Sequence, residues 1–255
     1  MTTETRNPTI LLIAGHWLGA WAWDEVREGL TANGRDAIAL TLPGLDPHDP
    51  ERSSRTLDDQ AAAIEEAMAR AGASAERPVV LVGHSGANAP LSIVVDRHPE
   101  LIRRIVWVDS GPVAPGSVFA PELPDAVEEL PLPPFDVLGE QASLEGLSAE
   151  MLERFRARAV PEPGPVLREP VELTNDARRR VPTTLVCCSI PSAQLLELAR
   201  AGHPMFAEVD ALDDLEVIDL PTGHWPMWSR PADLARVIGS AAASADEGAY
   251  TRTSL

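Results

Sequence analysis

Ser85 stands in a short segment whose residue types favour nucleophilic chemistry. The segment Gly83-His84-Ser85-Gly86-Ala87 follows an apolar run at 79–82 and precedes a helical stretch at 89–97. A serine between small residues, at a sharp turn from a buried strand into a helix, is typical of a nucleophile elbow. Such a turn strains the serine backbone and exposes its hydroxyl at the carboxyl edge of a parallel sheet. The segment also fits an ordinary strand-to-helix turn with an N-terminal serine.

The elements needed to position this serine alternate between short apolar strands and amphipathic helices. The expected strands cover residues 9–14, 36–40, 78–83, 102–109, 183–188 and 215–220. Clear helical patterns between strands cover residues 23–32 and 56–71, in addition to the stretch after Ser85. This alternation predicts an α/β fold, with a doubly wound, mostly parallel sheet and right-handed crossovers.

Residues 111–180 interrupt the alternation. They are rich in proline and glutamate, with one clear helix at 149–159 and no strand signal. We expect an inserted helical lid over the strand ends, which would exclude water and shape substrate choice. A decorative insertion without a role is the alternative. The core would then comprise residues 1–110 and 181–245, and residues 246–255 would form a flexible tail.

Composition favours one enzyme-sized domain that acts on a small molecule. The chain has 255 residues, of which 44% are hydrophobic, enough to bury a large core. Its 21 basic residues are all arginine, spread without a cluster, against 39 acidic residues for a net charge of −18. Neither nucleic acid nor an anionic membrane is therefore an expected partner. Homo-oligomer formation stays open.

Cysteine usage and the chain start predict a cytoplasmic protein without a metal or cofactor. The only cysteines, Cys187 and Cys188, are adjacent in an expected strand, so their side chains point to opposite faces and cannot easily form a disulfide. The N-terminus is polar, and no apolar stretch has the length of a membrane span. Neither metal-ligand spacing nor a glycine-rich phosphate loop is present in the sequence.

Three segments resemble the α/β-hydrolase superfamily. They are Leu-Leu-Ile-Ala-Gly-His-Trp-Leu-Gly-Ala-Trp at 11–21, the elbow at 83–87, and Thr-Gly-His-Trp-Pro at 222–226. The resemblance implies the α/β-hydrolase fold and a triad in the chain order Ser, acid, His. His224 matches the family's catalytic histidine, which takes the serine proton and returns it to the leaving group. A histidine on a surface turn is the alternative.

The acid departs from the commonest family pattern. After the strand 183–188 the sequence reads Ser-Ile-Pro-Ser, with no carboxylate until Glu197. An acid after the preceding strand is a known alternative in the superfamily, as in haloalkane dehalogenases and some lactonases. Asp109 stands there, so the resemblance implies that Asp109 orients His224. An aspartate that caps the next turn, or a Ser–His dyad without an acid, stays open.

The remaining site residues follow from position in the family pattern. Residues 14–21 resemble the oxyanion loop, although Ala14 replaces the usual histidine. The backbone amides of His16 and Gly86 would form the oxyanion hole, where only backbone is required. Tryptophans beside the catalytic loops would offer a flat or apolar wall. The histidine inside the elbow could instead pack or hydrogen-bond locally. The candidate substrate-binding residues are Trp17, His84 and Trp225.

These features predict a serine hydrolase that cleaves an ester, lactone or related acyl bond of a small, mostly apolar molecule through an acyl-enzyme. One alternative is a cofactor-free dioxygenase or a lyase-like enzyme of the same fold, in which the His–Asp pair deprotonates the substrate. Another is a silent small-molecule binding protein, as in hormone receptors built on this fold. Serine at the elbow argues against haloalkane dehalogenases, which carry aspartate there.

Overall fold

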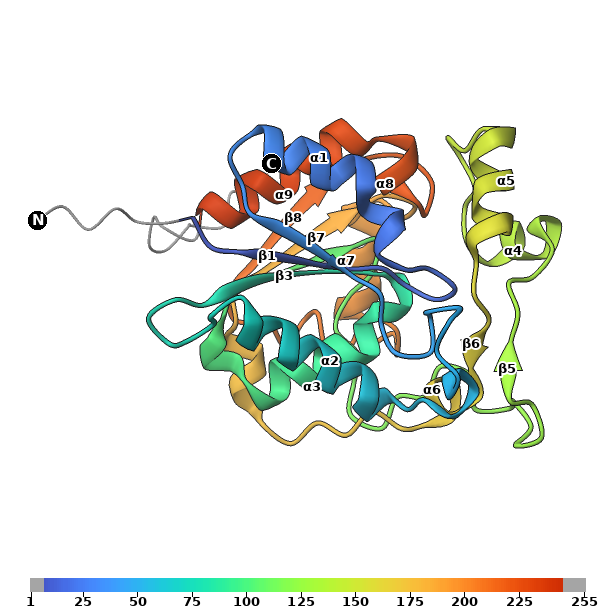
Figure 1. Cartoon of the computed structure of the whole chain (residues 1–255). Coiled ribbons are helices and arrows are strands. Elements are labelled where there is room, and N and C mark those ends of the chain that lie inside the picture. Colours follow the sequence, from blue (N-terminus) through green and yellow to red (C-terminus); the bar gives the residue numbers. More distant parts are fainter. Residues whose placement is uncertain (1–6, 245–255) are drawn as a thin grey trace, which may run out of the picture.

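A six-stranded parallel sheet lies at the centre of the computed structural model, which describes residues 7–244 (Figure 1). The strand order is β2-β1-β3-β4-β7-β8, and every neighbouring pair is parallel. The strands are β1 (Ile10–Ile13), β2 (Ala37–Leu40), β3 (Val79–His84), β4 (Ile102–Val108), β7 (Thr183–Cys187) and β8 (Leu215–Asp219). The predicted doubly wound parallel sheet is therefore confirmed, while the expected tail at 246–255 lies outside the described residues.

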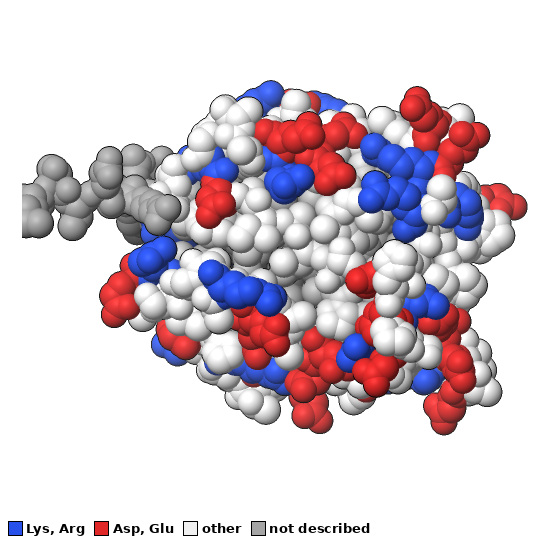
Figure 2. All heavy atoms as spheres, viewed as in Figure 1, with Lys and Arg blue, Asp and Glu red and all other residues white. Residues whose placement is uncertain are grey.

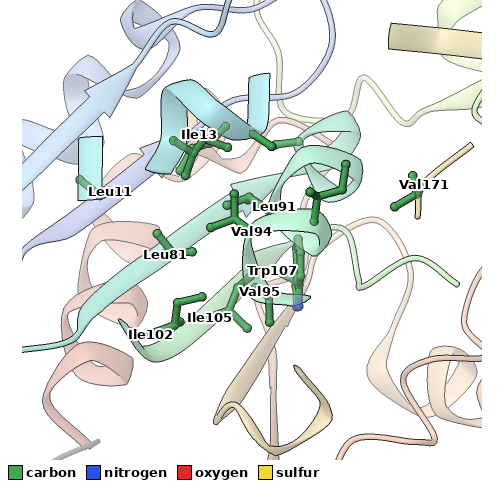
Figure 3. Packing of buried hydrophobic residues seen from close by; sticks show 14 of the residues in the cluster. Leu11, Ile13, Leu81, Leu91, Val94, Val95, Ile102, Ile105, Trp107 and Val171 are labelled. Carbon is green, nitrogen blue, oxygen red and sulfur yellow. The ribbon is translucent and has the colours of Figure 1, made fainter. Parts of the chain in front are cut away.

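Helices cover both faces of the sheet, which explains why its central strands are nearly continuous apolar runs. On one face lie α1 (Asp24–Ala32), α8 (Pro226–Ser229) and α9 (Pro231–Ser244); on the other lie α2 (Leu57–Arg70), α3 (Asn88–Arg97) and α7 (Ser192–Arg200). All six residues of β3 are buried. Figure 3 shows the packing on the α2–α3 face, where Leu91 and Val94 of α3 meet Leu81 and Ile105 of the sheet.

Short turns of 3-10 helix connect several of these elements. They are η1 (Ala20–Trp23), η2 (Arg52–Ser54), η3 (Ser85–Ala87), η4 (Pro99–Leu101) and η5 (Asp176–Arg180). The turn η3 joins β3 directly to α3, so the predicted nucleophile begins a strand-to-helix connection. The expected strands agree with the observed ones within one residue at each end.

The inserted segment 111–180 holds more structure than the sequence predicts. It contains β5 (Glu129–Leu130), α4 (Phe135–Gln141), α5 (Ala149–Arg158), β6 (Glu162–Pro163) and α6 (Gly164–Arg168). The helix expected at 149–159 is present as α5, whereas the expectation of no strand is wrong. The strands β5 and β6 pair in antiparallel orientation, but two residues are too few to show an alternating pattern. Figure 1 shows α4, α5, β5 and β6 beyond the carboxyl ends of the sheet strands.

The inserted segment is also part of the hydrophobic core. Phe155 of α5 is fully buried in the cluster on the α1–α9 face, and Val171 is buried in the cluster on the α2–α3 face. A decorative insertion would leave both clusters intact when removed. These contacts mean that removal of 111–180 exposes apolar surface on both faces of the sheet.

Arginines gather on α5, contrary to the expectation of an even spread. Figure 2 shows blue side chains grouped at the end of the molecule where α5 lies, whereas red acidic side chains are scattered over much of the same face. Arg154 pairs with Glu25 at 3.2 Å, and Arg158 lies over the ring of Trp21. These arginines therefore fasten α5 to the domain.

Among the described residues, no helix is long and apolar enough to cross a membrane.

Candidate active site

Ser85 occupies a strained turn at the carboxyl end of β3. Its φ angle is 51°, in the left-handed region that favours glycine, which confirms the strain expected of an elbow serine. A side chain at Gly83 would overlap with Leu91 of α3, so glycine lets the helix pack against the strand directly. The tight packing of α3 holds Ser85 in this conformation, because the surrounding structure must offset the strain.

The three residues predicted as a triad lie together in one hydrogen-bonded chain. His224 Nε2 is 2.8 Å from Ser85 Oγ, and His224 Nδ1 is 2.6 Å from Asp109 Oδ2. A carboxylate only accepts hydrogen bonds, so Nδ1 carries a proton and the neutral ring leaves Nε2 free to accept from the serine. The parallel pairing of β3 with β4 sets this geometry, since it places the ends of both strands side by side.

Asp109 is held by further donors from the loop after β7. Its Oδ1 accepts from the backbone amides of Cys188 (3.0 Å) and Ser189 (2.8 Å), and its Oδ2 accepts from Ser189 Oγ (2.6 Å). Burial alone would raise the pKa of Asp109. The hydrogen bonds and charge of His224, with the Ser189 donors, outweigh burial and hold the pKa below its usual value. The sequence analysis named Asp109 as the candidate acid but assigned no role to Ser189.

His84 supports the His224 loop from behind. Its Nε2 donates to the backbone carbonyl of His224 at 2.7 Å, and the side chain is almost fully buried. Burial, followed by the charge of His224, lowers the pKa of His84 to about 3. His84 is therefore neutral near pH 7 and acts as a hydrogen-bond donor to the loop. The inserted segment holds the same loop, since the His224 amide donates to the carbonyl of Ser143 at 2.7 Å.

The oxyanion loop packs tightly against the elbow. A Cβ on Gly15 would lie 2.8 Å from the His84 carbonyl oxygen and 2.9 Å from the Gly86 nitrogen. A Cβ on Gly86 would overlap with the imidazole of His16, so this ring fills the space beside the residue that follows the nucleophile. The structure thus brings His16 and Gly86 together. The Gly86 amide lies in the first turn of η3, where backbone donors lack an intrahelical acceptor.

The three candidate substrate-binding residues are all buried. The exposed fractions of Trp17, His84 and Trp225 are 8%, 1% and 3%. The Trp225 ring lies 4.9 Å from the His224 ring, edge to face. The hydrogen bond from His84 to the His224 carbonyl keeps this side chain against the His224 loop, so it does not form an exposed surface for a substrate.

Phe119 of the inserted segment is an exposed aromatic residue that the sequence reasoning missed. Its side chain is 58% exposed, and its ring centroid lies 4.2 Å from that of His16. A lone phenylalanine in a proline-rich loop gives no local signal of this position. Phe119 offers an apolar surface next to the elbow.

Neither cysteine contributes to this site as a reactive group. Cys187 and Cys188 are free and buried. Burial raises the pKa of Cys187 to about 12 and that of Cys188 higher still, so both thiols stay protonated. Among residues 7–244, no group of three histidine, cysteine, aspartate or glutamate side chains could hold a metal ion.

The sequence is similar to those of curated esterases. The chain is 33% identical over 108 residues to esterase PIR7B of Oryza sativa subsp. japonica, which covers 42% of this chain and 40% of that protein. It is 30% identical over 121 residues to putative methylesterase 12, chloroplastic, of Arabidopsis thaliana, with 46% and 34% covered. The matched part therefore spans less than half the length of these curated relatives.

Solved structures and a family model extend the likeness to nearly the whole chain. The fold superposes on an extracellular alpha/beta-hydrolase from a Paenibacillus species with a TM-score of 0.72 at 20% identity, covering 92% of this chain and 98% of that one. The sequence matches the model of the alpha/beta hydrolase family over residues 10–237. Because this match includes the elbow, the acid position and the histidine loop, the chain belongs to the α/β hydrolase family.

Proposed function

We propose that the protein hydrolyses an ester, lactone or related acyl bond of a small, mostly apolar molecule. The observation that carries the proposal is the unbroken chain of hydrogen bonds from Ser85 through His224 to Asp109. Each contact has the length and the donor direction that nucleophile activation needs. The named esterase and methylesterase relatives support ester hydrolysis as the reaction class.

In the proposed reaction Ser85 Oγ attacks the acyl carbon while His224 Nε2 takes the serine proton. The imidazolium that forms is stabilised by Asp109, whose lowered pKa keeps it a carboxylate. His224 then gives the proton to the leaving alcohol, and the acyl-enzyme remains. Water then gives a proton to the same histidine and attacks the acyl carbon. His224 returns this proton to Ser85 Oγ as the bond between Ser85 Oγ and the acyl carbon breaks and the acid is released. The residues named supply nucleophile, base and acid, so the reaction requires no cofactor.

The carbonyl oxygen gains negative charge in each tetrahedral intermediate. The backbone amides of His16 and Gly86 are the proposed donors to this oxygen, because both belong to segments packed directly beside Ser85. The expected substrate is apolar because Phe119 borders this side of the site and the imidazole beside it is largely buried.

The test combines covalent labelling with turnover. A fluorophosphonate should label Ser85, as located by mass spectrometry, and Ser85→Ala should lose aryl-ester hydrolysis by several orders of magnitude while keeping its circular dichroism spectrum. Ser54→Ala, a surface serine bonded to the Glu51 carbonyl, is the matched control and should keep full activity.

Other outcomes identify the other chemistries of this fold. Near-wild-type hydrolysis by Ser85→Ala would overturn the nucleophile assignment. Oxygen consumption with a heteroaromatic substrate, with only weakened binding in Ser85→Ala, would indicate a cofactor-free dioxygenase. Ligand binding without labelling or turnover would indicate a silent binding protein.

A further inference from the structure

Glu162 of β6 is a buried carboxylate that the proposed reaction does not use. It accepts hydrogen bonds from the Trp17 backbone amide at 3.2 Å and from Gln60 Nε2 at 3.4 Å, and its Oε2 lies 3.2 Å from His16 Nδ1. Only 1% of the residue is exposed. None of these three partners is a permanent cation, so this carboxylate is costly to bury. Its contacts join the inserted segment to the oxyanion loop.

Trp17 is fastened to the inserted segment at three points. Its backbone amide donates to Glu162, its carbonyl accepts from the Val160 amide at 3.0 Å, and its indole Nε1 donates to the Leu130 carbonyl at 3.0 Å. The φ angle of Trp17 is 65°, a conformation that tryptophan adopts only when its surroundings impose it. The hydrogen bonds from the insertion impose this conformation, and so fix the peptide between His16 and Trp17.

The imidazole of His16 lies against Glu162. Its Nδ1 is 3.2 Å from Glu162 Oε2, whereas its Nε2 is buried with no hydrogen-bond partner among the described residues. The ring lies in the space beside Gly86 that a side chain there would occupy. Loss of Glu162 therefore removes the polar contact that keeps the ring against Gly86, together with one of the three bonds to Trp17.

We infer that Glu162 is a positioning residue that sets the oxyanion hole from the inserted segment. One contact holds the His16 side chain and the other holds the amide that follows His16, so together they set the backbone of His16. The direction of the His16 amide decides whether the developing oxyanion receives a hydrogen bond. This inference rests on the proposed function, because it concerns the oxyanion hole of that reaction. The insertion then acts on the chemical step as well as on access to the site.

The test is the pair Glu162→Ala and Glu162→Gln, assayed on an aryl butyrate. Removal of one oxyanion donor typically lowers kcat by about 10² to 10³, so Glu162→Ala should lose about that much with KM changed less than about threefold. In Glu162→Gln the amide oxygen can still accept from the Trp17 amide and can still lie against His16 Nδ1. This variant should retain kcat within about tenfold of wild type.

Inhibitor affinity separates positioning from a merely structural role. A trifluoromethyl ketone forms a hemiketal: Ser85 Oγ bonds to its carbonyl carbon, the serine proton passes to His224, and the carbonyl oxygen becomes an oxyanion. Glu162→Ala should bind this ketone about 10²-fold more weakly, while its affinity for the matching unreactive methyl ketone stays within about threefold. A residue that only anchors the insertion would weaken both ketones alike, and that result would overturn the inference.

Glu129→Gln is the control variant. Glu129 lies opposite Pro163 in the same short ribbon and pairs with Arg52, without a contact to the oxyanion loop. It should keep the wild-type kcat and the wild-type affinities for the trifluoromethyl ketone and the methyl ketone.

Equal kcat values for Glu162→Ala and the wild type would also refute the inference.

The proposed function and this inference fail in different ways. If the wild-type protein hydrolyses no ester and Ser85 takes up no fluorophosphonate, the proposed function is wrong. The positioning role is then decided by amide hydrogen exchange at His16 and Trp17. Exchange must accelerate at least about tenfold in Glu162→Ala, relative to Glu129→Gln, for the role to stand. Unchanged exchange would overturn it.

Discussion

Asp109→Asn tests the least expected part of the site, an acid supplied by β4. In the native protein two backbone amides, those of Cys188 and Ser189, donate to Oδ1, while Oδ2 faces His224 and Ser189 Oγ. An asparagine amide oxygen must take the place of Oδ1, because an NH₂ group there would face two backbone donors. Each donor left without an acceptor costs about 1 to 3 kcal/mol, so the flipped amide is disfavoured by about 2 to 6 kcal/mol.

The favoured orientation points the asparagine NH₂ at His224 Nδ1. His224 must then accept at Nδ1 and carry its proton on Nε2, the atom that faces Ser85 Oγ. The histidine can no longer take the serine proton, and its cationic form has lost its carboxylate. In a serine protease with a Ser-His-Asp triad the same change lowers kcat about 10⁴-fold, which corresponds to about 5 kcal/mol of transition-state stabilisation.

The assay is the kcat of aryl-ester hydrolysis, with circular dichroism and a melting curve to establish that the variant is folded. Asp219→Asn is the matched control, because Asp219 ends β8 and accepts from the Ser192 amide at 2.8 Å and Ser192 Oγ at 2.6 Å, without a histidine. It should keep activity within about twofold. A folded Asp109→Asn protein that loses less than about tenfold would refute the reasoning. Glu197 would then be the next acid to replace, and a wild-type rate for that variant would leave a Ser–His dyad.

Three further results are expected. Since the native pKa of His84 is about 3 and its unfolded value is near 6.5, the unfolded chain binds the extra proton between these limits. The free energy of unfolding should therefore fall by up to about 1.4 kcal/mol per pH unit as pH drops from about 6.5. The urea midpoint of His84→Gln should fall less steeply with decreasing pH than that of the wild type; equal steepness in the two proteins would contradict this. Cys187 and Cys188 should resist a thiol reagent in the native protein at mildly alkaline pH and react after denaturation, because burial keeps both protonated; rapid native labelling would contradict the burial. Gly15→Ala should lower stability by about 1 to 3 kcal/mol and kcat more than about tenfold, since its Cβ meets backbone atoms of the elbow, whereas Gly239→Ala in α9, with no atom nearer than 3.7 Å, should do neither.

The parts of the fold that could be predicted from sequence are those with a local physical cause. The strand 79–84 is a buried apolar run, and the strain at Ser85 follows from the residues around it. Asp109 could be proposed because the loop after β7 lacks a carboxylate and the family resemblance offers the end of the preceding strand as another place for the acid. The first two features need only neighbours in the chain, whereas the third needs the order of elements together with the resemblance.

Long-range polar contacts could not be predicted in the same way. Glu162 and His16 lie far apart in the sequence, in the inserted segment and after β1, and no residue near Glu162 signals their contact. The strands β5 and β6 are too short to show alternating apolar and polar residues, so the sequence did not predict the two-stranded ribbon that carries Glu162. Ser189 stands where the family pattern places a carboxylate, and the sequence did not predict that it donates two hydrogen bonds to Asp109. Each of these contacts depends on tertiary packing, which local propensity does not encode.

The backbone bonds between the inserted segment and the His224 loop have a consequence for sequence divergence. The carbonyls of Ser143 and Glu145 accept from the amides of His224 and Gly223, so these contacts depend on the path of the chain and not on side-chain identity. Substitutions across the segment can accumulate without disturbing the histidine. Exchange of the whole segment between relatives would not be neutral, because a different loop length moves those carbonyls. Point substitutions within the segment should therefore preserve activity more often than replacement of the whole segment by that of a relative.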